Sequence, residues 1–435
     1  MIGFQSAVIR QKPHRRTLNR NGGGNIDPMN MLRTRHDAQT QRTARSEWGH
    51  MRVFEPMLRP IGVAAAFFAL SCGDPSVAPR AAGVGVQTSG SVRFRVETVA
   101  EGLRVPWEIA FAPDGRIFVT ERQGRIRVIE NGKLRPEPLA VIKEAVHRGE
   151  GGLMGLALHP KFSENGWIYV SYLYQDGGLT VRVERYTLRD DALQEPKVIL
   201  DGIEGGGIHN GCRIAFGPDG KLYVTTGEVG RGDLAQQLNT QNGKTLRIND
   251  DGSVPRDNPF VGRAGARPEI WSYGHRNAQG IAWQPGTRLM FQTEHGPSGF
   301  DAPGGGDEVN IVESGKNYGW PAIHHRETRE GMVSPLLEYT PAVAPGGCTF
   351  YSGAKIPEWK GNFFFACLRG RRIIRVELDG RRVVSQENLL QDKFGRIRQV
   401  VEGPDGYLYF CTSNQDGRGR PAGNDDRVLR IVPAE

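Results

Sequence analysis

Five stretches of the chain repeat one pattern of apolar and polar positions. Each stretch contains a turn with Pro and Gly and continues as an alternation of apolar with polar residues. The stretches are "FAPDGRIFVTE" (111–121), "LHPKFSENGWIYVSY" (158–172), "FGPDGKLYVTTGE" (216–228), "WQPGTRLMFQTEHG" (283–296) and "EGPDGYLYFCTS" (402–413). In the Pro-Asp-Gly turns, Pro fixes φ, Asp bonds to nearby backbone and Gly adopts a positive φ. The alternation predicts a half-buried β-strand after each turn.

Four of the units also contain a second strand that ends at a tight turn. These strands lie in "RIRVIENGK" (125–133), "TVRVERYTLRDD" (180–191), "KTLRINDDGS" (244–253) and "IIRVELDGR" (373–381). Their alternation places Val, Ile and Leu on one face and Arg on the other. The sequence predicts no helix longer than two turns.

The spacing of the units predicts how many there are. The turn prolines Pro113, Pro160, Pro218, Pro285 and Pro404 are 47, 58, 67 and 119 residues apart. The last interval is about two periods long and contains a degenerate unit over residues 348–382. Repeats of this length that hold several short strands are typical of β-propeller blades. We therefore predict an all-β, six-bladed β-propeller over residues 93–435, with a functional site at one end of its channel.

Composition agrees with this fold and argues against nucleic-acid binding. The 435 residues include 58 Gly and 27 Pro, which favour turns over helices. The formal net charge is +8, but residues 1–60 hold eleven Arg and Lys against four acidic residues. Residues 61–435 are therefore nearly neutral, and no extended basic face for nucleic acid is expected.

The segment before the repeats carries targeting signals. Residues 1–50 are expected to be an incorrectly assigned start or a disordered leader, with Met51 or Met57 as the initiator. Basic residues precede an apolar run over 61–70, which is too short to span a bilayer and suits a signal peptide over 51–72. The residues before Cys72 resemble a lipoprotein cleavage site, although Ala69 stands where Leu is usual. We expect a periplasmic or secreted protein, with or without a lipid anchor, and a linker over 73–92.

The remaining cysteines, Cys212, Cys348, Cys367 and Cys411, leave their chemistry open. No C-x-x-C pair is present, which argues against a zinc site. In an oxidising compartment these thiols could form disulfides, but their pairing cannot be deduced from the sequence.

His209 is the first candidate for chemistry. It follows "EGGG" in a loop where glycines allow a ligand to approach the backbone closely. Glu228 ends the strand that returns alongside it. A carboxylate bonded to one ring nitrogen sets the tautomer and leaves the other nitrogen as a base. The alternative is a structural histidine bonded to backbone.

Arginines form the second group of candidates. Arg276 and Asn277 precede an apolar strand, and their fork and amide suit a planar carboxylate or quinone. Arg369, Arg396 and Arg398 are expected at the starts of the last two blades. Period two places Arg396 and Arg398 on one face, where they repel each other unless an anion lies between them. The alternatives are an exposed turn and an exposed basic strand face.

Residues 293–321 are the candidate metal segment. The carbonyl groups of Gly296 and Pro297, together with Asp307 and Glu308, provide oxygen ligands at irregular spacing that suit Ca²⁺. The spacing differs from an EF-hand loop, and a solvated acidic loop is the alternative.

Several longer motifs together resemble one family. They are "EGGLMGLALHP", "HNGCRIAFGPDGKLYVTTGE", "NGKTLRINDDGSVPRDNPF", "GHRNAQGIAWQP", "EHGP" with "GDEVNIVESGKNYGWP", and "RIRQVVEGPDG". Over about residues 96–433 the chain resembles the soluble quinoprotein sugar dehydrogenases, which use pyrroloquinoline quinone (PQQ), and especially their periplasmic aldose dehydrogenase branch. The resemblance implies a six-bladed propeller with PQQ and Ca²⁺, an aldose substrate oxidised to a lactone, and an external electron acceptor.

The resemblance also assigns roles to the catalytic and cofactor-binding candidates. His209 matches the general base, and Glu228 matches its acidic partner, which is Asp in the glucose enzyme. Arg276 and Asn277 match groups beside the reactive carbonyl of the quinone. Cations that hold the cofactor's carboxylates are matched by Arg369, Arg396 and Arg398, although position 369 is Lys in glucose-type enzymes.

The remaining matches concern the sugar and the metal. Glu150 matches a sugar-side residue that is Gln in the glucose enzymes, which leaves the substrate preference open because a carboxylate only accepts hydrogen bonds. Gly296 and Pro297 match carbonyl ligands of the calcium that binds the cofactor. Glu308 and the carbonyl of Tyr318 match a second, structural calcium. The insertion "SGFDAPGGG" (298–306) lengthens the loop between these motifs.

Two other functions compete with this one. A calcium-dependent propeller lactonase requires a ring of carboxylate and Asn ligands in the channel, and we cannot assemble such a ring from this sequence. A non-catalytic binding propeller at the cell surface would not require His209. The sequence does not identify the sugar or the electron acceptor, and it leaves both a monomer and a homodimer open.

Overall fold

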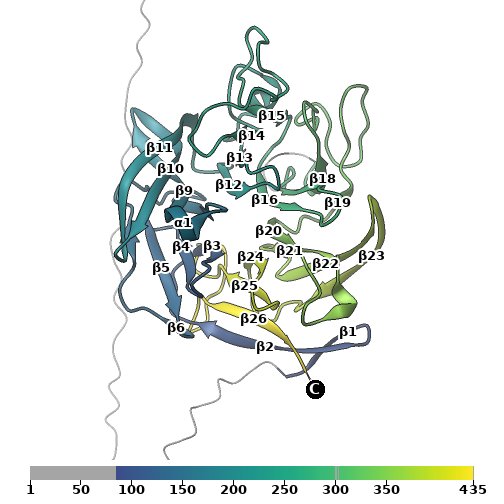
Figure 1. The fold of residues 1–435 in the computed structure, drawn as a ribbon. Helices are drawn as coiled ribbons and strands as arrows, with labels where there is room; N and C mark the ends of the chain where they lie inside the picture. Colours follow the sequence, from purple (N-terminus) through teal and green to yellow (C-terminus); the bar gives the residue numbers. More distant parts are fainter. Residues whose placement is uncertain (1–84, 299–300, 302, 435) are drawn as a thin grey trace, which may run out of the picture. The chain divides into compact units, whose positions relative to one another are not determined.

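A computed structural model describes residues 85–298, 301 and 303–434, and these residues form a six-bladed β-propeller (Figure 1). The leader expected over 1–50 and the signal peptide expected over 51–72 lie outside the described residues. The first strand, β1 (Gln87–Ser89), pairs with β2 (Val92–Ala100). Because β1 lies inside the segment expected to be a linker, the propeller begins earlier than residue 93.

The first three blades follow one another along the chain. Blade one contains β3 (Pro106–Phe111), β4 (Ile117–Glu121), β5 (Arg125–Glu130), β6 (Lys133–Leu134) and β7 (Ala140–Val141). Blade two contains β8 (Leu153–Leu158), β9 (Trp167–Asp176), β10 (Gly178–Arg189) and β11 (Ala192–Glu204). Blade three contains β12 (Gly211–Phe216), β13 (Leu222–Thr226), β14 (Lys244–Ile248) and β15 (Ile270–Tyr273).

The other three blades complete the ring. Blade four contains β16 (Ala278–Trp283), β17 (Met290–Glu294), β18 (Asp307–Val312) and β19 (Leu337–Tyr339). Blade five contains β20 (Pro345–Phe350), β21 (Phe363–Cys367), β22 (Arg372–Asp379) and β23 (Arg382–Leu389). Blade six joins β24 (Ile397–Glu402), β25 (Leu408–Thr412) and β26 (Val428–Pro433) to β2 and β1. Helical turns in the described part are α1 (Phe162–Asn165), η1 (Gly232–Gln236) and η2 (Pro357–Trp359), which confirms that helices are short.

The ring is closed by pairing between the two ends of the described chain. Strand β2 pairs antiparallel with β26, with Val96 opposite Ile431. The first strands of the blades also contact one another in the closed series β3, β8, β12, β16, β20 and β24. The connections at the ends of these strands therefore meet around one axis.

The repeated turns form by the mechanism that the sequence indicates. In the turn before β13, the carboxylate of Asp219 accepts the N–H of Lys221, 3.1 Å away, and Gly220 adopts a φ of +73°. The backbone of Gly217 closes the turn by donating to the carbonyl of Lys221 at 2.8 Å. The turns at Asp114 and Asp405 make the same side-chain contact.

Hydrophobic packing occurs mainly between neighbouring blades. For example, Phe118 of blade one and Tyr172 of blade two belong to one buried cluster, with exposed fractions of 0% and 1%. Full burial of such a side chain stabilises the fold by about 1.5–3 kcal/mol. The four cysteines whose pairing the sequence left open, Cys212, Cys348, Cys367 and Cys411, are buried free thiols. Across the described residues, the helices are too short or too polar to traverse a bilayer.

We expect Phe118→Ala to lower the free energy of unfolding by about 3–5 kcal/mol, because it leaves a cavity between blades one and two. Chemical denaturation measures this loss. As a control, Val141→Ala removes a side chain that is 51% exposed and should change the value by less than about 0.5 kcal/mol. A similar small loss in both variants would contradict the packing of Phe118 between the blades.

Candidate active site

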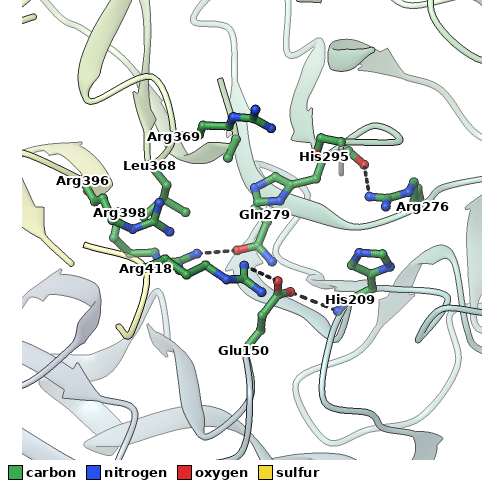
Figure 2. A pocket seen from close by; sticks show the side chains of 12 residues that line it. Glu150, His209, Arg276, Gln279, His295, Leu368, Arg369, Arg396, Arg398 and Arg418 are labelled. Atoms are coloured by element: carbon green, nitrogen blue, oxygen red, sulfur yellow. Dashed lines mark hydrogen bonds and ion pairs between the residues drawn. The ribbon is translucent and has the colours of Figure 1, made fainter. Parts of the chain in front are cut away.

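A cavity of about 360 Å³ collects most of the residues that the sequence singled out (Figure 2). It is lined by Glu150, His209, Arg276, Gln279, His295, Ser298, Ala344, Leu368, Arg369, Arg396, Arg398 and Arg418. These residues come from blades two to six. They lie on the first strand of a blade, in the connection before it, or in the connection between the second and third strands. The structure therefore brings His209 together with the predicted Arg276, Arg369, Arg396 and Arg398 in one cavity.

His209 lies in the connection between β11 and β12 and is 5% exposed. Its Nδ1 bonds to the carboxylate of Glu228, which follows β13 and is 2% exposed. Because a carboxylate accepts hydrogen bonds, Nδ1 carries the proton and Nε2 is the basic nitrogen. Strands β12 and β13 pair antiparallel, as the sequence predicted, and this pairing brings Glu228 next to His209.

Glycines allow the backbone around His209 to pack closely. A Cβ on Gly227 would lie 1.8 Å from the carbonyl oxygen of His209, and a Cβ on Gly149 would lie 2.0 Å from that of Gly207. His209 itself has a φ of +51°. The sequence indicated that the glycines before His209 allow a ligand to approach. Of these, Gly205 packs against Leu173 and Gly206 against Val229, whereas a Cβ on Gly207 would meet no atom within 4 Å.

A buried lysine supports the strand connection that carries Glu228. The ammonium group of Lys244 donates to the carbonyl groups of Leu234, Ala235 and Asn242 at 2.8, 3.1 and 2.6 Å. Asn242 in turn donates from Nδ2 to the carbonyl of Gly227 at 3.0 Å. The "NGK" part of a motif singled out in the sequence thus holds the backbone next to Glu228.

Glu150 connects the backbone of His209 to the opposite side of the cavity. Its Oε2 accepts the N–H of His209 at 3.1 Å, and its Oε1 accepts Arg418 Nη1 at 2.7 Å (Figure 2). Burial alone would raise the pKa of Glu150, but His295, Arg418 and His209 outweigh burial and lower it to about 2. Burial lowers the pKa of His295 to about 3, so its ring is neutral at pH 7.

Two of the arginines are held by carboxylates. Arg276 is 3% exposed, and its Nε and Nη2 bond to Asp301 at 3.0 and 2.6 Å. Arg396 Nε bonds to Asp416 at 2.8 Å. Arg369 was expected at the start of a blade, but it lies in the turn between β21 and β22 because blade five already begins at β20. Its side chain still lines the cavity.

Arg398 differs from these arginines because no carboxylate in the described part of the chain bonds to it. It lies on β24 and is 6% exposed. Its Nη1 donates to Gln279 Oε1 at 2.9 Å, and its buried Nε has no hydrogen-bond partner among the described residues. Burial lowers the pKa of Arg398 to about 9. Because this guanidinium is buried and bonds to no carboxylate among the described residues, it would stabilise an anion bound beside it.

Asn277, which the sequence placed beside a ligand, is not one of the lining residues. It is 0% exposed, and its Oδ1 accepts the N–H of Gly211 at 3.1 Å. This contact holds the start of β12 next to the start of β16. Asn277 therefore lies behind the cavity, where it positions the backbone two residues beyond His209.

The segment that holds the candidate calcium ligands Gly296 and Pro297 follows the cavity wall, since His295 and Ser298 both line it. The carboxylate of Asp307 anchors this segment. It accepts the N–H of Gly296 at 2.9 Å and those of Val343 and Ala344 at 2.6 Å each. Asp307 thereby joins the connection after β17 to the one before β20.

Glu308 and Tyr318, the other calcium candidates, lie in blade four and the loop that follows. Burial, together with Glu294 and the other nearby acids Asp307 and Glu338, raises the pKa of Glu308 well above its usual value. Tyr318 is 3% exposed and stacks on His275 with ring centroids 4.8 Å apart. Among the described residues, no group of three or more His, Cys, Asp or Glu side chains is arranged to hold a metal ion. The carboxyl groups of Glu294, Asp307 and Glu338 nevertheless lie near the half-buried Glu308, and such a group of oxygen donors suits a cation.

Six of the twelve lining residues were missed by the sequence analysis, among them Gln279, His295 and Arg418. Gln279 lies two residues after Asn277, and period two along β16 could have indicated it. His295 directly precedes the Gly296–Pro297 pair. Arg418 lies in an irregular loop between β25 and β26, where the sequence has no periodic pattern to indicate its direction.

Comparison with known proteins identifies what this arrangement is similar to. The sequence profile of the glucose/sorbosone dehydrogenase family matches residues 103–422. The aldose sugar dehydrogenase YliI of Escherichia coli is 35% identical over 348 residues, which cover 74% of this chain and 91% of that protein. Quinoprotein glucose dehydrogenase B of Acinetobacter calcoaceticus is 27% identical over 423 residues, which cover 75% of this chain and 87% of that protein.

The fold is also similar to that of a solved aldose sugar dehydrogenase. The PQQ-bound form of the aldose sugar dehydrogenase from Streptomyces coelicolor matches with a TM-score of 0.69 and 33% sequence identity. The match covers 79% of this chain and 99% of that one.

We expect Asp307→Asn to lower the free energy of unfolding by about 2–3 kcal/mol at pH 7, because the amide NH₂ would face backbone N–H donors. Chemical denaturation measures the change. Asp379→Asn is the matched control, because Asp379 is 72% exposed and its loss should have little effect. If Asp307→Asn is as stable as that control, Asp307 does not anchor the two connections.

Proposed function

Because the chain belongs to the glucose/sorbosone dehydrogenase family, we propose that it is a PQQ-dependent dehydrogenase that oxidises the C1 hydroxyl of an aldose to a lactone. One observation carries this proposal: His209, bonded to Glu228, lines the same cavity as the buried guanidinium of Arg398. A sugar oxidation by hydride transfer requires a base and an acceptor next to each other. The cavity offers the base together with cations for an anionic acceptor.

The residues of the cavity fit PQQ, which is a flat tricarboxylate. Arg398 would hold one carboxylate, since its Nε lacks a hydrogen-bond partner among the described residues and it has no carboxylate of its own there. Arg369 and Arg396 line the same cavity and would bind the others by charge-assisted hydrogen bonds. When bound, PQQ would supply an electrophilic quinone carbon that can accept a hydride, which carries both electrons of the oxidation.

The chain's own residues supply the acid–base chemistry. His209 Nε2 accepts the proton of the C1 hydroxyl as hydride leaves C1, and Glu228 stabilises the resulting imidazolium. General-base assistance of this kind contributes about 10²–10⁴ in rate. Glu150 faces the same cavity and can accept a hydrogen bond from a second sugar hydroxyl, since a carboxylate has about four acceptor sites.

We also propose Ca²⁺ as the metal of this enzyme. The carbonyl groups of Gly296 and Pro297 are candidate ligands because their segment follows the cavity wall. Glu308 and the carbonyl of Tyr318 are candidates for a second ion, and the neighbouring carboxyl groups of Glu294, Asp307 and Glu338 support a cation there. Oxygen donors of mixed carbonyl and carboxylate type are those that Ca²⁺ prefers.

We further propose that the protein acts in the periplasm or outside the cell. The signal-peptide pattern over residues 51–72 supports this location, and Cys72 offers a site for a lipid anchor. In that location an external electron acceptor would reoxidise the cofactor. The chain is proposed to work as a monomer or a homodimer.

Reconstitution tests the proposed function. We expect the purified protein to bind PQQ in an absorbance titration and then to reduce a dye when an aldose is added, with activity lost when EGTA removes Ca²⁺. Heat-denatured protein with the same additions is the control. Absence of sugar oxidation across a panel of aldoses would contradict the proposal, and lactone hydrolysis without PQQ would instead support the lactonase alternative.

Replacement of the base tests its role. We expect His209→Gln to lower kcat by about 10²–10⁴ because the C1 hydroxyl then has no base, while PQQ affinity stays within a few-fold of the wild type. Steady-state kinetics and an absorbance titration give the two values. His159→Gln is the control, since His159 lies beyond the other end of β8 from Glu150. Unchanged kcat in His209→Gln would exclude His209 as the base.

A further inference from the structure

A second cavity adjoins the candidate active site and is lined largely by arginines. Its volume is about 350 Å³, and Arg369, Arg371, Arg396, Arg418 and Arg420 line it. We call this second cavity the arginine groove. Three of them, Arg369, Arg396 and Arg418, also line the cavity that contains His209. The two cavities therefore share a wall of guanidinium groups.

The arginine groove carries positive charge that the protein does not balance. Arg371 pairs with Asp392 at 2.7 Å, and Arg418 pairs with Glu150. For Arg369 and Arg420, which are both exposed, no hydrogen bond or ion pair is found among the described residues. Two uncompensated charges thus lie in a cavity that opens to solvent beside the active site.

The loop that carries Arg418 and Arg420 is fastened to the propeller. Asn414 Nδ2 donates to the carbonyl of Phe394 and to Asp425, each at 2.9 Å. Asp416 accepts the N–H of Arg418 at 2.9 Å through Oδ1 and Arg396 Nε through Oδ2. The close packing needs Gly419, because a Cβ there would lie 2.4 Å from the carbonyl oxygen of Asn414. The exposed guanidinium groups are therefore attached to a fixed backbone.

We propose that the arginine groove is a capture site for PQQ, where a carboxylate of the cofactor binds from solvent before it reaches Arg398. This inference rests on the proposed function. A small cavity suits a small molecule, and guanidinium groups bind carboxylates through paired hydrogen bonds. Because Arg369, Arg396 and Arg418 belong to both cavities, an incoming carboxylate keeps a cationic partner as it moves inward. A neutral sugar would gain nothing from this excess charge.

The rate of cofactor association tests the proposal without an activity assay. Stopped-flow mixing of the apoprotein with PQQ can be followed by tryptophan fluorescence, since Arg398 and Arg276 lie over the rings of Trp107 and Trp320 at 5.9 and 5.3 Å. We expect Arg420→Gln and Arg371→Gln each to slow association about twofold to threefold at low ionic strength, and Arg420→Glu to slow it more. Dissociation should stay unchanged, because neither residue lines the inner cavity.

Salt and a matched variant control this experiment. The differences should vanish at about 1 M salt, where charges are screened over a few ångströms. Arg382→Gln removes an exposed arginine of β23 that pairs with Asp379, and it should leave association unchanged. Equal association rates for the wild type, Arg420→Gln and Arg420→Glu at low salt would overturn the capture site, and so would an equal effect of Arg382→Gln. If the wild-type protein binds no PQQ, the proposed function itself fails.

Discussion

The site depends on an electrostatic constraint: a buried guanidinium must find a compensating partner for the water it has lost. An unpaired ion in a protein interior costs several kcal/mol even after relaxation. Arg276 and Arg396 meet this requirement with Asp301 and Asp416, but among the described residues Arg398 contacts the amide of Gln279 and the ring of Trp107 and bonds to no carboxylate. An anionic ligand would supply what Arg398 lacks, and this is why we propose a ligand that carries carboxylates.

The propeller places this cation opposite a base. Because the first strands of the six blades contact one another in a closed series, loops from blades two to six open into the same cavity. Figure 2 shows Arg396 and Arg398 extending from one side and the imidazole of His209 on the other. Close backbone packing at Gly227 and the carbonyl contacts of Lys244 hold the Glu228 connection, so the base and its partner are positioned before any ligand binds.

The sequence predicted the features that are set by residues close together in the chain, and it did not predict contacts between distant residues. Turns such as Pro218–Gly220 and the alternation after them are local, and they were sufficient to predict six blades. His209 and Glu228 were matched because they flank two strands joined by one such turn. In contrast, Glu150 and Arg418 are 268 residues apart, and only the closed ring brings them together. The direction of Asn277 and the anchoring role of Asp307 depend on packing between blades, which periodicity does not report.

Net charge also reports only a total, and it does not show where the charged residues lie in the fold. The body of the chain is nearly neutral by composition, and the sequence analysis therefore expected no broad basic face. Composition cannot show that five arginines line one cavity together with a single acidic residue, Glu150. The proposed function rests on this local concentration of positive charge and not on the net charge of the chain.

A crystal structure of the protein with PQQ and Ca²⁺ tests the central claim most directly. We expect a PQQ carboxylate bonded to the guanidinium of Arg398, with the imidazole of His209 next to the quinone. PQQ bound outside this cavity, or Arg398 bonded to a protein carboxylate in its presence, would contradict this account of the site.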